Sequence, residues 1–160
     1  MASNQEFHKT KELKSGLGST KIELVELNGK RVVLKHFKTL NKLKKELELY
    51  QMLQNEDFIP NIVYHDEVNK ILAIEYCGES LDLKFKPKFR YVFKNDIRCI
   101  VKYLSETHNI YHNDIRWKNI CIKDSQLFLI DWERWSTENK ERDPEYILRD
   151  KTPPILHNFW

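Results

Sequence analysis

Two segments of alternating apolar and polar residues flank the dipeptide Asn28-Gly29. Lys21–Leu27 comes before it and Arg31–Phe37 comes after it. Such alternation indicates strands that bury one face, and Asn-Gly between two of them is the strongest short signal for a tight β-hairpin. This hairpin constrains the fold more than any other feature, because it fixes which two strands pair and in which direction.

The spacing of the apolar residues changes directly after the hairpin. Over Thr39–Gln54 they recur every three or four positions, which is the stripe of an amphipathic helix. Thr39 stands where the first turn needs an oxygen that accepts a backbone hydrogen bond, so it is the expected N-cap. The stripe consists of Leu40, Leu43, Leu47, Tyr50 and Leu53.

The rest of the chain combines short strands with one more helix. The first ten residues are polar and are expected to be loose. This order indicates an α+β chain with a sheet-rich first half and a helical second half. The remaining expected elements are strands at Ile62–Tyr64 and Lys70–Tyr76, an irregular basic stretch over 81–90, a helix at Asn95–His108, and strands at Ile120–Ile122 and Leu127–Ile130.

Length and composition limit the class of protein. The chain has 160 residues and a formal net charge of +3, which suits one domain and does not indicate a nucleic-acid partner. The three cysteines, Cys77, Cys99 and Cys121, form no CxxC pair, so neither a disulfide framework nor a zinc site is expected. The sequence shows no signal peptide and no membrane-spanning apolar run, so we expect a protein of the cytosol or nucleus.

The segment 112–131 contains the residue types that phosphoryl transfer requires. His112, Asp114 and Asn119 form the pattern HxDxxxxN, and a hydrophobic strand that ends at Asp131 follows. Phosphoryl transfer depends on positioning and on neutralised charge, and Mg²⁺ prefers oxygen ligands such as those of Asn119 and Asp131. Asp114 is placed to orient an attacking hydroxyl and to take its proton.

Two basic side chains accompany this pattern. Arg116 and Lys118 lie between the aspartate and the asparagine, and they would stabilise charge on a transferring phosphoryl group. The plainer interpretation is a loop in which Asp114 and Asn119 only cap turns. The strand that ends in an aspartate at a fitting distance favours the functional interpretation.

These residues resemble the protein-kinase-like superfamily. His112, Asp114 and Asn119 match the catalytic loop of that superfamily, and Asp131-Trp132-Glu133 stands where protein kinases have DFG. The resemblance implies that the chain binds ATP and Mg²⁺. It also implies catalytic roles for Asp114 and Arg116, and metal ligation by Asn119 and Asp131.

The first half of the chain fits the same resemblance. Lys35, in the run VVLK, matches the lysine that binds the α- and β-phosphates, and Glu46 in the expected helix matches the glutamate that pairs with it. Ile71–Cys77 resembles the strand that leads to the adenine-binding hinge. The resemblance therefore implies that the backbone of Glu75 and Cys77 faces adenine.

The match to the superfamily is incomplete. Gly16 and Gly18 form a GxG that would cover the phosphates, but Lys21 stands at the third glycine. The DWE segment has an acidic residue two positions after the aspartate, which is similar to aminoglycoside and choline kinases. Arg116 resembles the arginine of some tyrosine kinases. Only 29 residues follow Asp131, so we expect most of the usual C-terminal helices to be missing.

The resemblance covers about residues 12–135 and implies one bilobal domain over 1–160, with a sheet-rich N-lobe at about 10–77 and a truncated helical C-lobe at about 78–160. The leading expectation is an atypical Ser/Thr-type protein kinase that transfers the γ-phosphate of ATP to a hydroxyl. One alternative is a small-molecule kinase of the aminoglycoside or choline type. Another is a kinase-like module that regulates a partner protein, with the aromatic terminus 155–160 covering the open core or docking the partner.

Overall fold

A computed structural model describes residues 8–13, 19–84 and 87–140 of the chain. These residues form two compact units. One unit contains the described residues up to Glu79 together with Cys121–Glu133. The other contains Ser80–Ile120 and the described residues from Arg134 onward. The two units are considered separately below.

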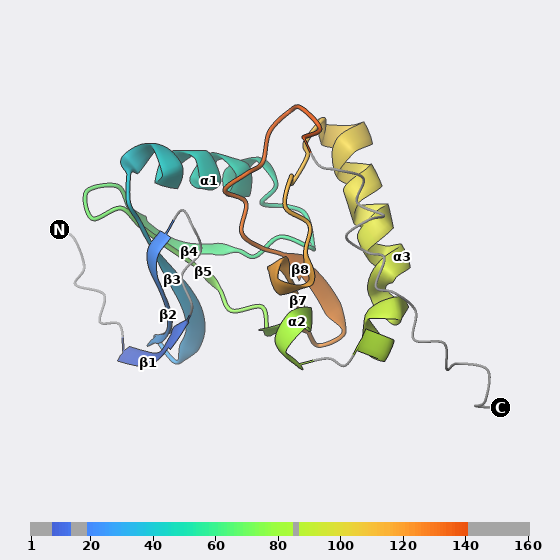
Figure 1. Ribbon diagram of the computed structural model, residues 1–160. Helices are drawn as coiled ribbons and strands as arrows, with labels where there is room; N and C mark the ends of the chain where they lie inside the picture. Colours follow the sequence, from blue (N-terminus) through green and yellow to red (C-terminus); the bar gives the residue numbers. More distant parts are fainter. Residues whose placement is uncertain (1–7, 14–18, 85–86, 141–160) are drawn as a thin grey trace. The chain divides into compact units, whose positions relative to one another are not determined.

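The first unit is built on a five-stranded antiparallel sheet (Figure 1). Its strand order is β1-β2-β3-β5-β4. Alternate apolar side chains from three of these strands form a core cluster on the sheet. The strands are β1 (His8–Leu13), β2 (Ser19–Leu27), β3 (Lys30–Phe37), β4 (Ile62–Asp66) and β5 (Ile71–Glu75).

The predicted hairpin is confirmed. β2 and β3 pair along their whole length, with Leu27 opposite Lys30 at the closed end. Asn28 and Gly29 both have positive φ, at 51° and 75°. A two-residue turn with both residues in the left-handed conformation matches the twist of the flanking strands. Asn and Gly adopt this conformation with less strain than other residues.

The expectation that the first ten residues are loose is wrong from His8 onward. His8–Leu13 forms β1, which pairs antiparallel with β2 from His8 opposite Glu26 to Leu13 opposite Ile22. β1 is an edge strand with a polar sequence, so it lacks the apolar alternation that identifies a strand. Its backbone pairs with a neighbour that has a much stronger strand sequence, which explains how it forms.

The predicted helix after the hairpin is also confirmed. α1 (Leu40–Met52) begins after Thr39, whose side-chain oxygen accepts a hydrogen bond from the Lys42 amide at 3.4 Å. It packs against β3 and β5 in Figure 1. The buried face of α1 consists of Leu43, Glu46, Leu47, Leu49 and Tyr50. A glutamate in the middle of this apolar face requires a partner, which is described below.

A smaller sheet of order β6-β7-β8 follows. β6 is the two-residue strand Glu79–Ser80, and β7 (Ile120–Lys123) and β8 (Gln126–Leu129) form a second hairpin. The strands predicted at Ile120–Ile122 and Leu127–Ile130 are therefore present. β8 returns to the first unit, because the Leu129 amide donates a hydrogen bond to the Phe58 carbonyl at 2.9 Å.

The second unit is helical in its first half. α2 (Leu81–Lys84) is one turn, α3 (Pro87–Tyr103) is the long helix, and a π-helical turn at Leu104–His108 continues it to a left-handed cap at Asn109. The predicted helix at Asn95–His108 is therefore present but starts earlier. The prediction of irregular structure over 81–90 is wrong, because α2 and the start of α3 are helical there. Pro87 is well suited to the first turn of α3, where its missing N–H needs no partner.

Some expectations concern residues that the structure does not describe. Gly16, Gly18 and the aromatic terminus 155–160 lie outside the described residues. Within the described ranges, no helix combines the length and the apolar character needed to cross a membrane.

Candidate active site

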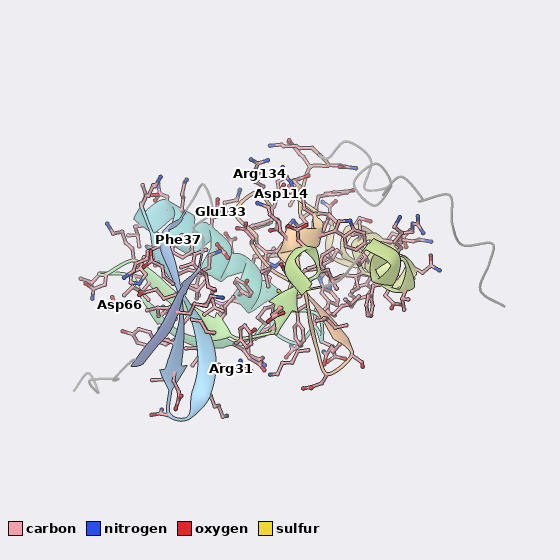
Figure 2. All side chains as sticks on the ribbon, turned by 60° about the horizontal axis from the view of Figure 1, so that its bottom comes forward. Arg31, Phe37, Asp66, Asp114, Glu133 and Arg134 are labelled. Carbon is pink, nitrogen blue, oxygen red and sulfur yellow. The ribbon has the colours of Figure 1, made fainter. Side chains whose placement is uncertain are left out.

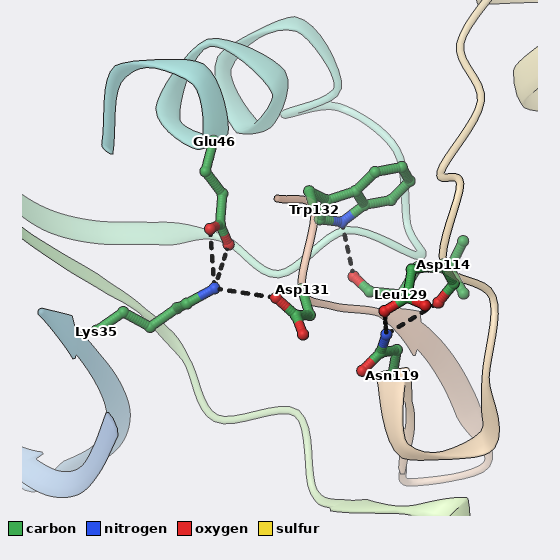
Figure 3. A network of polar contacts seen from close by, with 7 residues as sticks. All are labelled: Lys35, Glu46, Asp114, Asn119, Leu129, Asp131 and Trp132. Atoms are coloured by element: carbon green, nitrogen blue, oxygen red, sulfur yellow. Dashed lines mark hydrogen bonds and ion pairs between the residues drawn. The ribbon is translucent and has the colours of Figure 1, made fainter. Parts of the chain in front are cut away.

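Lys35 and Glu46 form a buried ion pair in the first unit. Lys35 lies on β3 and Glu46 on the inner face of α1, and both side chains are almost completely excluded from solvent. The Lys35 Nζ atom is 2.6 Å from Glu46 Oε1 and 2.8 Å from Oε2 (Figure 3). The contact that the resemblance implied is therefore formed, and it satisfies both carboxylate oxygens.

The surroundings of the pair shift the pKa values of both Lys35 and Glu46. Burial works to lower the pKa of Lys35, but the nearby carboxylates, Glu46 first and Asp131 second, raise it above its ordinary value. Burial raises the pKa of Glu46, and the ammonium group of Lys35 opposes that shift. The ammonium form of Lys35 is thus favoured at neutral pH, as a phosphate-binding lysine requires.

Asp131 completes this cluster. Its Oδ1 atom lies 3.7 Å from Lys35 Nζ, and its side chain is about one quarter exposed, at 25%. The residue has φ of 66°, a left-handed conformation in which aspartate is tolerated better than most residues. The next residue, Trp132, is fully buried and donates its indole N–H to the Leu129 carbonyl at 3.1 Å. This hydrogen bond and the burial of the indole hold the backbone next to Asp131 in place.

The predicted catalytic loop lies in the second unit. Asn119 donates from its side-chain nitrogen to the Asp114 carbonyl at 2.9 Å and to Asp114 Oδ2 at 3.1 Å. The Asp114 amide in turn donates to His112 Nδ1 at 3.2 Å. All three residues are buried. The pattern HxDxxxxN therefore forms one hydrogen-bonded loop, which a simple turn-capping interpretation does not require.

Two arginines contact Asp114. Arg116 Nε lies 2.6 Å from Asp114 Oδ1. Arg134 Nη1 lies 3.9 Å from the same oxygen, and Figure 2 labels Asp114 and Arg134. Arg116 was a candidate from the sequence. Arg134 was not, because it lies 20 positions after Asp114 and belongs to no motif. Only the fold of the second unit brings it to the loop that contains His112, Asp114 and Asn119.

Asn113 is a further residue that the motif analysis missed. Its side-chain nitrogen donates to the Arg134 carbonyl, Ser136 Oγ and the Glu138 carbonyl at 3.2, 2.8 and 3.1 Å. Its oxygen accepts from the Lys140 amide at 2.8 Å. The residue has φ of 60°. One amide therefore attaches the segment 134–140 to the catalytic loop, next to Asp114.

The predicted hinge residues lie at the end of β5. The Glu75 carboxylate accepts from Lys123 Nζ at 2.9 Å and from Asn61 Nδ2 at 3.0 Å. The Lys123 hydrogen bond is the main cause that lowers the pKa of Glu75. The buried thiol of Cys77 donates to the Glu75 carbonyl at 3.4 Å. These contacts fix the Glu75 carboxylate and the Cys77 thiol at the end of β5.

A groove of about 740 Å³ lies beside Glu75 and Tyr76, at the end of β5. Its rim includes Arg31, whose guanidinium lies 4.6 Å from the centre of the Tyr76 ring. Asn28, Lys30 and Lys123 also line it. All of these residues belong to the first unit.

The oxygen atoms of the two predicted metal ligands suit a hard cation. The side-chain nitrogen of Asn119 is committed to Asp114, so its amide oxygen is the atom left for a cation. Asp131 offers a partly exposed carboxylate. Carboxylate and amide oxygens are the ligands that Mg²⁺ prefers. The two residues lie in different units, and the contacts of each residue leave an oxygen atom that could bind a cation.

One buried polar group in the first unit has no hydrogen-bond partner within the described residues. The Tyr50 hydroxyl lies on the inner face of α1, one turn after Glu46, and it is completely enclosed. Burial, followed by the charges of Glu46 and Asp131, raises the pKa of this hydroxyl well above its ordinary value. The phenol therefore remains neutral at any working pH.

Comparisons with known proteins support the fold. No protein-family model matches the chain, and no curated protein does either. Many solved structures resemble it. One is the PK-1 kinase of Cydia pomonella granulovirus, at a TM-score of 0.64 and 17% sequence identity, over 81% of this chain and 54% of that one. The chain thus spans about half the length of this neighbour.

This similarity shows a kinase-like fold. The predicted α+β class with a sheet-rich N-terminal region is confirmed. At 17% identity the comparison does not extend to activity or substrate. The bilobal arrangement and the roles of the site residues remain predictions.

Proposed function

We propose that this chain is an ATP- and Mg²⁺-dependent phosphotransferase, of the atypical Ser/Thr-type protein kinase class, that transfers the γ-phosphate to a hydroxyl. The observation that supports this most strongly is the Lys35–Glu46 ion pair, with Asp131 beside it. A buried ion pair costs desolvation and is a weak source of stability. Its presence in an otherwise apolar layer is better explained by a requirement for a fixed ammonium group.

Each residue has a defined task in this proposal. Lys35, oriented by Glu46, binds the α- and β-phosphates. Asp131 and the amide oxygen of Asn119 hold Mg²⁺, which when bound neutralises phosphate charge. Asp114 orients the acceptor hydroxyl and accepts its proton.

The remaining positions in the proposal contact the nucleotide or the transferring group. Arg116 stabilises charge on the transferring phosphoryl group. The backbone of Glu75 and Cys77 binds adenine, and Gly16 and Gly18 cover the phosphates. The proposal requires that residues of both units act on the same ATP, and it places the protein in the cytosol or nucleus.

A kinase-like binding module is the second candidate function. The chain spans 54% of the length of the viral kinase that it resembles, and a kinase-like fold can also serve to bind a partner protein. Such a module would retain its partner when Asp114 or Asp131 is changed to asparagine. A small-molecule acceptor in place of a protein is a variant of the first proposal, and it is tested with the same enzyme.

The decisive experiment is a phosphoryl-transfer assay with labelled ATP and Mg²⁺, with autophosphorylation and added protein acceptors measured together. Wild type is compared with Asp114→Asn and Asp131→Asn, and with Asp96→Asn, an exposed position on α3 that matches the chemical change. We expect transfer by wild type and by Asp96→Asn, and a loss of at least about 100-fold in the other two variants.

The other outcomes separate the candidates. Equal transfer by all four proteins would contradict the site assignment. Absence of transfer together with Mg²⁺-dependent ATP binding would favour a nucleotide-binding regulator. Absence of both would leave only the partner-binding module.

A further inference from the structure

Two guanidinium groups approach one carboxylate oxygen in the second unit. Arg116 and Arg134 lie 2.6 and 3.9 Å from Asp114 Oδ1. The Asp114 side chain is 11% exposed, whereas each arginine side chain is 51% exposed. The carboxylate is therefore buried beneath a positively charged rim that remains open to solvent.

The position of Arg134 is fixed by its own backbone. Its carbonyl accepts a hydrogen bond from Asn113 Nδ2 at 3.2 Å. Two residues further on, Ser136 and Tyr111 exchange backbone hydrogen bonds of 2.9 and 3.1 Å. The backbone from Arg134 to Ser136 is thus attached next to the loop that contains Asp114. This attachment brings the Arg134 side chain within reach of the aspartate.

The charges in this cluster do not balance. One carboxylate offsets one guanidinium, so the pair of arginines leaves an excess positive charge beside Asp114. Each guanidinium has five N–H donors in a planar fork. A single oxygen atom uses few of them, so within the described residues most donors of both arginines remain for another acceptor. A carboxylate or phosphate matches this fork best.

We infer that the acceptor of this phosphotransferase is a Ser/Thr peptide with an acidic side chain beside the reacting hydroxyl, and that Arg134 binds that acidic group, next to Arg116 and its contact with the transferring phosphoryl group. This inference rests on the proposed function in one respect: the peptide is an acceptor only if Asp114 orients its hydroxyl for phosphoryl transfer. The binding preference itself rests only on the arginine pair. A neutral or basic flanking residue would leave the rim without a counter-charge.

A matched pair of fluorescent peptides tests the inference by binding. Both contain one serine, and they differ only by aspartate or asparagine at the neighbouring positions. Their affinities are measured by anisotropy at low and at physiological salt, for wild type, Arg134→Gln, Arg134→Lys and Arg98→Gln. Arg98 lies on α3 and hydrogen-bonds to Asn95, so its variant makes the same change in net charge away from the catalytic loop.

We expect wild type to prefer the aspartate peptide by roughly fivefold, which is the effect of one partly exposed charge pair. The preference should disappear in Arg134→Gln, persist in Arg98→Gln, and persist in part in Arg134→Lys, which keeps the charge but loses the fork. Equal affinity of wild type for the two peptides would overturn the inference. An equal loss in Arg134→Gln and Arg98→Gln would also overturn it, because it would indicate a response to net charge alone.

Phosphate transfer to the same two peptides separates this inference from the proposed function. Equal transfer to both peptides by wild type would leave the kinase proposal intact and overturn the acidic preference. Preferential binding that depends on Arg134, without transfer to either peptide, would support the arginine site and count against the phosphotransferase.

Discussion

Lys35 Nζ donates hydrogen bonds to both carboxylate oxygens of Glu46, although neither side chain has more than marginal contact with solvent. The two residues come from β3 and α1, so this contact joins the sheet to its covering helix. Removal of Lys35 would leave Glu46 as an uncompensated buried charge, whereas removal of Glu46 would leave Lys35 with Asp131 alone. The contact therefore links the candidate chemistry directly to the stability of the first unit.

Lys35→Met should lower the free energy of unfolding by about 3–5 kcal/mol, because it leaves the Glu46 carboxylate buried without its partner. Glu46→Leu should lower it by less, because Asp131 remains 3.7 Å from Lys35 Nζ. The double variant Lys35→Met/Glu46→Leu removes both charges and should recover much of that loss. Urea unfolding followed by circular dichroism measures all three. A double variant that is as unstable as the sum of the singles would contradict this account of the pair.

Two glycines with similar backbone angles should respond very differently to alanine. Gly78 has φ of 85°, and a Cβ atom there would lie only 2.0 Å from the Ile122 carbonyl oxygen. Gly29 has φ of 75°, and a Cβ atom there would meet nothing within 4 Å. Gly29→Ala should cost about 1 kcal/mol of conformational strain. Gly78→Ala adds a backbone clash, so it should cost several times more or prevent folding.

The melting temperatures of Gly29→Ala and Gly78→Ala are compared by thermal unfolding, and each variant is the control for the other. Because both change the backbone preference in the same way, the difference between them reports the close approach of Gly78 to β7. Equal melting temperatures would mean that the chain near Gly78 and Ile122 can separate without loss of stability.

The three cysteines should differ in reactivity. Burial raises the pKa of Cys77 to about 12 and that of Cys121 to about 12, whereas Cys99 is exposed on α3. Since the thiolate is the reactive form, a pKa of about 12 reduces reactivity at pH 8 by roughly 1000-fold relative to an ordinary thiol. A chromogenic disulfide reagent at pH 8 should therefore modify one thiol per native chain and three after denaturation.

A Cys99→Ser variant is the control for the cysteine measurement. It should show almost no fast reaction in the native state at pH 8, and reaction of the two buried thiols should appear only as pH rises toward 12 or as the chain unfolds. Rapid reaction of this variant at pH 8 would contradict the burial of Cys77 and Cys121.

Local sequence signals were sufficient where the structure follows from neighbouring residues. The Asn28-Gly29 turn, the Thr39 cap and the apolar face of α1 each depend on a few adjacent positions. The order of His112, Asp114 and Asn119 likewise predicted a loop that is held together by its own hydrogen bonds. These features could be read from the sequence because pairing or capping partners lie close along the chain.

The features that were missed depend on distant pairing. β1 has no apolar alternation and exists because β2 offers it a backbone partner. Pro87 begins a helix, although a proline in a basic stretch suggested irregular structure. Asn113 and Arg134 lie 21 positions apart, and no spacing rule connects an amide to a carbonyl that far along the chain. Such contacts become visible only when the fold is known.

Tyr50→Phe should leave the protein as stable as wild type, or more stable by up to about 1 kcal/mol. Its hydroxyl is enclosed without a hydrogen-bond partner within the described residues, and an apolar group of the same shape avoids that desolvation cost. The matched control is Tyr64→Phe, which removes a hydroxyl that donates to Asp66 at 3.3 Å and should cost about 0.5–1 kcal/mol. Urea unfolding measures both variants. A larger loss of unfolding free energy for Tyr50→Phe than for Tyr64→Phe would show that the buried hydroxyl has a partner such as an ordered water.

Asn113→Asp should release the segment 134–140 from the catalytic loop. The substitution keeps the shape of the side chain and its tolerance of the left-handed backbone, but replaces the N–H donors by an oxygen. That oxygen would face two carbonyl acceptors, on Arg134 and Glu138, and the repulsion should cost about 1–3 kcal/mol. Limited trypsin digestion detects the release directly, because Arg134 and Lys140 are themselves cleavage sites.

The control is Asn109→Asp, the same chemical change at another left-handed asparagine, with φ of 51° at the end of the π-helical turn. We expect cleavage after Arg134 or Lys140 to be at least tenfold faster in Asn113→Asp than in Asn109→Asp, in line with a loss above about 1.4 kcal/mol. Ser136→Ala, which removes one of the groups that accept a hydrogen bond from Asn113, should fall between them. Equal cleavage of the two aspartate variants would mean that the Asn113 amide does not hold this segment, and that the approach of Arg134 to Asp114 depends on other contacts.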